Sequence, residues 1–96
     1  MLNDDISKIL RENREVRDVF YSIYSFSSGQ PYNINKPGYV NMASQKFHLP
    51  VRKITDILDR LIKMKLIDNN GQTLKLRREA TNYVPEYLKS EFEKSV

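Results

Sequence analysis

The feature that most constrains this chain is a helical apolar pattern that leads straight into a tight hairpin. Four apolar residues recur at the spacing of one helix face within residues 51–65, namely Ile54, Ile57, Leu58 and Leu61. Pro50 precedes them, where its fixed φ suits a helix start and its missing N–H costs nothing. Residues 66–68 and 72–76 then flank Asn69-Asn70-Gly71, and Asn-Gly is a strong signal for a type I′ hairpin turn. The sequence therefore predicts a helix followed at once by two short antiparallel strands.

Further helical patterns and polar loops account for the rest of the chain. The predicted elements, in order, are one long helix over residues 4–26, a loop over 32–38, a very short strand at Tyr39-Val40, a short helix over 41–47, a turn over 48–50 and, after the hairpin, a C-terminal helix over 82–95. Asn3 or Asp4 is expected to cap the first helix and Asn41 the short one, because these side chains accept hydrogen bonds from the first N–H groups. The last helix is expected to begin near Asn82, with Pro85 in its first turn.

Composition narrows the class of protein. The 96 residues fit a single compact domain, residues 1–96. The absence of cysteine excludes disulfides and thiolate metal sites. No apolar run approaches the roughly 18 residues that a membrane span needs, and Asp4 and Asp5 are unlike the basic start of a signal peptide. We therefore expect a cytoplasmic protein that makes no membrane contact.

Positive charge is concentrated in the helix and the hairpin. Residues 52–78 hold eight basic and three acidic side chains, a net charge of +5, whereas the whole chain has a net charge of +4. A basic stretch confined to one part of a domain is the pattern that phosphate binding requires. Two other interpretations remain open, which are an ordinary solvated helix face and edge-strand charges that discourage sheet pairing.

The order of these elements is that of a winged helix-turn-helix domain. Residues 47–67 (FHLPVRKITDILDRLIKMKLI) resemble the recognition-helix segment of the MarR and PadR regulator families. Residues 74–81 (LKLRREAT) resemble their second wing strand and the start of the next helix. Ala43 matches the small residue of the first helix in the motif and Leu49 matches the leucine of the turn, whereas Lys65 replaces a customary glycine.

The resemblance spans about residues 39–81 and implies a mainly α fold with a small β-hairpin wing. The terminal helices, outside this winged-helix core, are expected to form a dimer interface. Tyrosines and other apolar residues of those helices suit a half-buried interface. The candidates for that interface, or for a shared core, are Phe20, Ile23, Tyr83, Tyr87, Leu88 and Phe92.

DNA recognition would follow from groove geometry. The major groove of B-DNA admits one helix, and the second helix of the motif enters it with its N-terminal residues at the base edges. Arg52 and Lys53 can donate to guanine, Thr55 can touch a thymine methyl or a phosphate, and Asp56 can accept from cytosine or orient an arginine. The candidate DNA-binding residues are Ser44, Lys46, Arg52, Lys53, Thr55, Asp56, Arg60, Lys75 and Arg77.

Nothing in the sequence indicates an enzyme. No nucleophile triad, glycine-rich phosphate loop or metal-ligand spacing is visible, and no cofactor is expected. His48 is the sole histidine, so it is interpreted as a turn residue that caps a helix or contacts phosphate. The acidic pairs near the N-terminus have arginine neighbours and are interpreted as solvated helix charge.

Three functions fit this pattern. The first is a homodimeric, sequence-specific binder of double-stranded DNA that acts as a transcriptional regulator, usually a repressor, associated with the nucleoid or a plasmid. The second is a centromere-binding adaptor of a plasmid or phage partition system, with a protein partner in the partition complex. The third is a protein-interaction winged helix that does not bind DNA. The basic residues on the predicted third helix argue against that last alternative.

Overall fold

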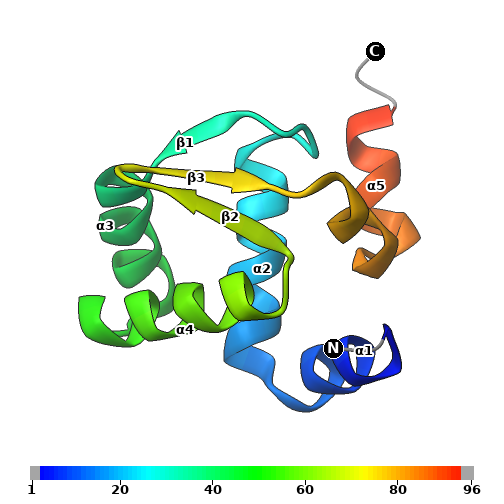
Figure 1. The fold of residues 1–96 in the computed structure, drawn as a ribbon, viewed down its shortest axis with the longest axis horizontal. Helices are drawn as coiled ribbons and strands as arrows, with labels where there is room; N and C mark the ends of the chain where they lie inside the picture. Colours follow the sequence, from blue (N-terminus) through cyan, green and yellow to red (C-terminus); the bar gives the residue numbers. More distant parts are fainter. Residues whose placement is uncertain (1–2, 94–96) are drawn as a thin grey trace.

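The computed structural model describes residues 3–93, and it is mainly helical with one small antiparallel sheet. The elements in chain order are α1 (Asn3–Glu12), α2 (Arg14–Phe26), β1 (Asn33–Asn35), α3 (Lys36–Phe47), α4 (Val51–Lys63), β2 (Ile67–Asn70), β3 (Thr73–Leu76), a 3₁₀ helix η1 (Arg78–Tyr83) and α5 (Glu86–Glu93) (Figure 1). None of the helices within residues 3–93 has the length and apolar character that crossing a bilayer demands. The arrangement is compatible with a winged-helix-like fold.

The sheet has the strand order β1-β3-β2, and both pairings are antiparallel. Ile34, Leu74 and Leu76 face the core, whereas alternate residues of the strands face solvent. The hairpin loop is tied back to the body of the domain, because the Lys36 N–H donates to the Gln72 carbonyl over 2.8 Å. The hairpin is therefore paired along β1 almost to its tip and projects little beyond it.

One continuous core joins α2, α3, α4 and the sheet. Buried Tyr39 links α3 to α2, because its hydroxyl lies 3.2 Å from the Val19 carbonyl and 2.5 Å from the Ser22 hydroxyl. Burial raises the pKa of Tyr39 to about 12. The inner side of α4 packs into the same core, and its predicted apolar stripe is confirmed, since Ile54 and Leu58 are fully buried.

The N-terminal region differs from its prediction, because residues 4–26 form two helices rather than one. Asn13 has extended φ and ψ of −116° and 93° and separates α1 from α2. Its side-chain amide donates to the Ile9 carbonyl over 3.1 Å, and asparagine readily bonds nearby backbone in this way outside helices. The break redirects α1 toward the C-terminal end of α4 (Figure 1), and Ile6 and Leu10 of α1 are buried in the core.

The strand predicted at Tyr39-Val40 is also wrong, because these residues lie within α3. The strand that precedes α3 is β1, and the N-cap is Asn35 rather than Asn41. The Asn35 side chain accepts a hydrogen bond from the Gly38 N–H over 2.8 Å. Pro37 occupies the first turn of α3, a position that proline favours, so the helix begins one turn earlier than its apolar pattern indicates.

The hairpin is confirmed, but its turn is displaced by one residue. Asn70 pairs with Thr73, so the loop consists of Gly71 and Gln72. Only Gly71, with a φ of +63°, has a positive φ in this loop. Glycine at the first loop position is the mark of a type II′ turn, whereas the predicted type I′ turn needs positive φ at both positions.

Local caps explain how α3 and α4 end. Lys65 adopts a left-handed φ of 62°, a conformation that glycine adopts most readily. The Leu66 N–H donates to Leu61 and the Lys65 N–H donates to Ile62, which is the bonding of a Schellman motif. His48 has a left-handed φ of 56° at the end of α3, and the next N–H, that of Leu49, donates to the Ser44 carbonyl.

The C-terminal helix begins later than predicted. Residues around Asn82 form η1, and α5 begins only at Glu86. Val84 is extended, with φ of −99° and ψ of 134°, because the ring of Pro85 disfavours helical backbone at the residue before it. The end of the predicted segment, residues 94–95, lies outside the described residues.

Candidate nucleic-acid interface

The outward side of α4 presents a row of charged side chains. Arg52, Asp56, Asp59 and Lys63 are exposed and lie opposite the buried stripe, at spacings of four, three and four residues. This row is electrically balanced, with two cations and two anions. None of the ion pairs found within residues 3–93 uses Arg52, so its guanidinium is available for an external acceptor.

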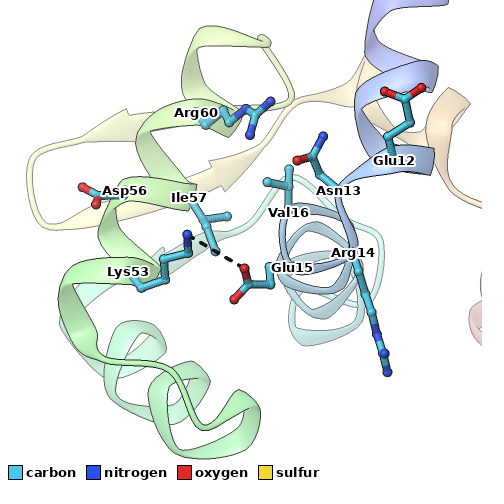
Figure 2. A pocket seen from close by; sticks show the side chains of 9 residues that line it. All are labelled: Glu12, Asn13, Arg14, Glu15, Val16, Lys53, Asp56, Ile57 and Arg60. Atoms are coloured by element: carbon cyan, nitrogen blue, oxygen red, sulfur yellow. Dashed lines mark ion pairs between the residues drawn. The ribbon is translucent and has the colours of Figure 1, made fainter.

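The two flanks of this row differ. On one flank the Thr55 hydroxyl donates to the Arg52 carbonyl over 2.8 Å, which leaves the hydroxyl oxygen able to accept a further bond. On the other flank Lys53 and Arg60 reach toward the junction of α1 and α2, whereas Asp56 points away from it (Figure 2). The Lys53 Nζ lies 3.8 Å from the Glu15 Oε1. Part of the positive charge of α4 thus faces the protein's own acidic residues.

A groove of about 360 Å³ separates α4 from the α1–α2 junction. Its lining residues are Glu12, Asn13, Arg14, Glu15, Val16, Lys53, Asp56, Ile57 and Arg60. Val16 and Ile57 are buried and close the bottom, and all the charged side chains lie at the rim. The cations at the rim are therefore not trapped and have room to turn outward.

Ser44, one of the predicted DNA-binding residues, holds the turn between α3 and α4 through hydrogen bonds. The Ser44 hydroxyl donates to the Leu49 carbonyl, and the Leu49 N–H donates back to the Ser44 carbonyl over 3.1 Å. Ser44 therefore fixes the angle at which α4 leaves α3. Lys46, in the last turn of α3, is exposed with its Nζ 5.5 Å from the centre of the Phe47 ring.

The hairpin cations are placed differently from those of α4. Arg77 Nη1 lies 3.1 Å from Asp68 Oδ1, and its Nε lies 3.6 Å from Glu79 Oε2. The Glu79 backbone N–H and the nearby Arg77 and Arg78 charges lower the pKa of the Glu79 carboxyl. Arg77 is therefore already engaged by two carboxylates.

Lys75 does not join the surface of α4. It lies on β3, the central strand, opposite Asp68 of β2 and Asn33 of β1. Its side chain is exposed, whereas the neighbouring Leu74 and Leu76 point into the core where the helices pack. The structure therefore brings Arg52, Lys53, Thr55, Asp56 and Arg60 together on one helix, with Lys46 on the helix before it, and places Lys75 on the opposite face of the sheet.

Two residues of this surface were not among the predicted contacts. Val51 is 47% exposed at the start of α4, although valine side chains are more often buried. Lys63 continues the exposed row four residues after Asp59. The helical period alone would have placed Lys63 beside the other charged residues.

The six candidate dimer residues divide between core and surface. Phe20 and Ile23 are fully buried and Leu88 is nearly so, so these three belong to the core and offer no surface to a second copy. Tyr83 is partly buried against the core, whereas Tyr87 is 66% exposed on α5. The side chain of Phe92 lies outside the described residues. Tyr21 stands near Tyr87, and burial together with that neighbour raises the pKa of the Tyr21 hydroxyl.

Comparisons with known proteins do not add an assignment. No family model matches the chain, and neither curated proteins nor solved structures gave a significant match. No cluster of three or more potential metal-ligating side chains occurs in the part of the chain that the structure describes. The arrangement of side chains on α3, α4 and the hairpin is thus the basis for a functional proposal.

Proposed function

We propose that this chain binds double-stranded DNA as a winged helix-turn-helix protein, with α4 as the recognition helix and β2–β3 as a short wing. The order of its elements supports this proposal. Two helices joined by the tight turn at residues 48–50 are followed by a hairpin whose second strand pairs with β1. In such modules the second helix lies in the major groove and the first crosses the backbone.

The observation that carries the proposal is the two-sided character of α4. Its inner side is anchored in the core through residues such as Ile54 and Leu58, so the helix is held in place while its outer side stays exposed to solvent. Arg52 lies in the first turn, which is the part of a recognition helix that meets base edges. Rigid support of an unpaired guanidinium is what bidentate recognition of guanine requires.

The neighbours of Arg52 fit the same role. Val51 is exposed beside it and can contact a thymine methyl, and Thr55 lies one turn further on. Lys46 lies next to the turn that precedes α4 and Lys63 is the last residue of α4, so the two lysines flank the helix at its two ends and could meet phosphates there. Base contacts at the start of α4 with phosphate contacts on either side would give both affinity and register.

The task that we propose is transcriptional regulation by a homodimer. Two copies of α4 held about 34 Å apart would enter successive major grooves and read two half-sites. Exposed Tyr87 on α5, beside partly buried Tyr21, supports an interface made by the C-terminal helix. Amphipathic tyrosines of this kind are enriched at protein interfaces.

The direct test is to select bound duplexes from a random pool and to measure affinity for the selected site at ~150 mM salt. Arg52→Ala is expected to weaken binding to that site by about 1–3 kcal/mol and to relax specificity at one base pair. Arg78→Ala is the matched control, since Arg78 is an exposed arginine in η1 beside the loop at Gly29 and Pro31.

Selection of no duplex would contradict the proposal. An equal loss in the Arg52 and Arg78 variants would show that only overall charge matters and would remove α4 from the role of recognition helix.

A further inference from the structure

A carboxylate of α2 stands where a DNA phosphate would approach α4. The break at Asn13 places the first turn of α2 across the groove from α4. Glu15 lies in that turn, and its Oε1 is 3.8 Å from the Lys53 Nζ (Figure 2). It is an ion pair between α4 and another element, so it links the recognition surface to the N-terminal helices.

The ion pair between Lys53 and Glu15 is weak enough to break when another anion approaches. Both side chains are 49% exposed, and water and salt screen such a pair strongly. The groove beside it gives the lysine stem room to swing, as Arg60 and Glu12 stand at the rim without closing it. Lys53 can therefore leave Glu15 for another anion without disturbing the core.

We propose that Glu15 competes with DNA phosphate for Lys53 and so weakens non-selective binding to duplexes. The proposal rests on the DNA-binding function proposed above. When DNA binds, Lys53 exchanges the Glu15 carboxylate for a phosphate, and the released carboxylate takes up a cation from solution.

Removal of the carboxylate should then change affinity in a recognisable way. Glu15→Gln is expected to tighten duplex binding by about two- to fivefold, since exposed ion pairs are weak. Cation uptake by the released carboxylate would no longer offset the release of counterions from DNA. The slope of log K against log salt should therefore become steeper by up to about 0.9, the value for one phosphate contact.

A charge-matched control separates this competition from a general gain of positive charge. Asp18→Asn changes the net charge equally on the same helix, but Asp18 pairs only with Arg14 and Arg17 within the described residues. Both variants should be measured with a selected duplex and a scrambled one, at about 50 mM and about 200 mM salt. Each should also be made in a Lys53→Ala background, and thermal unfolding should verify that all variants are folded.

The expected result is a gain for Glu15→Gln that exceeds the gain for Asp18→Asn, falls as salt rises, and vanishes when Lys53 is alanine. Equal gains in the two variants, or a gain that persists without Lys53, would overturn the competition while leaving the DNA-binding function intact. Absence of duplex binding by the wild type and every variant at low salt would overturn the DNA-binding function itself.

Discussion

α4 and the hairpin both carry basic residues in the sequence, but the fold leaves an arginine of α4 available to a partner and pairs the arginine that follows the hairpin with acidic residues. Arg52 on α4 has no acidic partner within residues 3–93, whereas Arg77 after β3 meets Asp68 and Glu79. The two arginines differ because, among the described residues, the fold places acidic side chains within ion-pair distance of Arg77 only. Counting basic residues along a segment therefore does not measure its capacity to bind phosphate.

The same contrast holds for the backbone. α4 exposes one side along its length. In the hairpin, by contrast, strand β3 is hydrogen-bonded on both edges, to β2 on one side and to β1 on the other. The hydrogen bond from Lys36 to the Gln72 carbonyl fastens even its loop. The hairpin packs against the helices, whereas α4 has an open side, and in the proposed function α4 is the element that meets DNA. Four substitutions test this division, and they are taken from the largest expected effect to the smallest.

Truncation of the inner side of α4 should have the largest effect. Leu58→Ala removes a fully buried side chain and is expected to lower the free energy of unfolding by about 2–5 kcal/mol. The adjacent Asp59→Ala, on the exposed side, should change it by less than about 0.5 kcal/mol. Urea unfolding curves of both variants measure the difference. Similar losses in the two would mean that α4 is not anchored in the way described.

The hairpin turn should show the next largest effect. Gly71→Ala places a Cβ on a residue with a φ of +63°, which costs about 1–2 kcal/mol in a left-handed backbone. No atom lies within 4 Å of that Cβ, so the loss would come from backbone strain alone. Gln72→Ala, at the neighbouring loop position, should be nearly neutral in the same unfolding experiment. Loss of stability in both variants would contradict the type II′ assignment.

Arg77→Ala should affect the hairpin more than DNA binding. Its two ion pairs are partly exposed, so the expected loss of unfolding free energy is at most about 1 kcal/mol. Asp68→Asn should cost a similar amount, and the double variant should lose less than the sum, because both changes break the same contact. A fall in duplex affinity as large as that of Arg52→Ala would erase the contrast between the hairpin and α4.

The junction between the two regions should give the smallest effect, and a favourable one. Lys65→Gly relieves the left-handed residue that ends α4 and is expected to raise the free energy of unfolding by about 0.5 kcal/mol. Lys65→Ala removes the charge but keeps the Cβ, so it should give no gain. A thermal melt distinguishes the two variants, and equal stabilisation by both would point to charge rather than backbone strain.

Sequence patterns were reliable where the deciding interactions are local. The stripe from Ile54 to Leu61 predicted the buried side of α4, and Asn70-Gly71 predicted a hairpin, because both depend on residues a few positions apart. The sequence patterns gave wrong helix bounds where a polar residue or a proline broke or started a helix against the spacing of the apolar residues. Asn13 divides a continuous apolar pattern into two helices, and Pro37 with Asn35 starts α3 before its apolar residues begin.

The amino-acid sequence by itself determined the mainly helical class, the inner and outer sides of α4 and the position of the hairpin, since helical period and turn chemistry act over a few residues. Only the tertiary structure decided that β1 pairs with β3, that Glu15 faces Lys53, and that, among residues 3–93, carboxylates pair with Arg77 and not with Arg52. These contacts join distant segments or depend on side-chain direction, so they exist only once the core has fixed the elements in space.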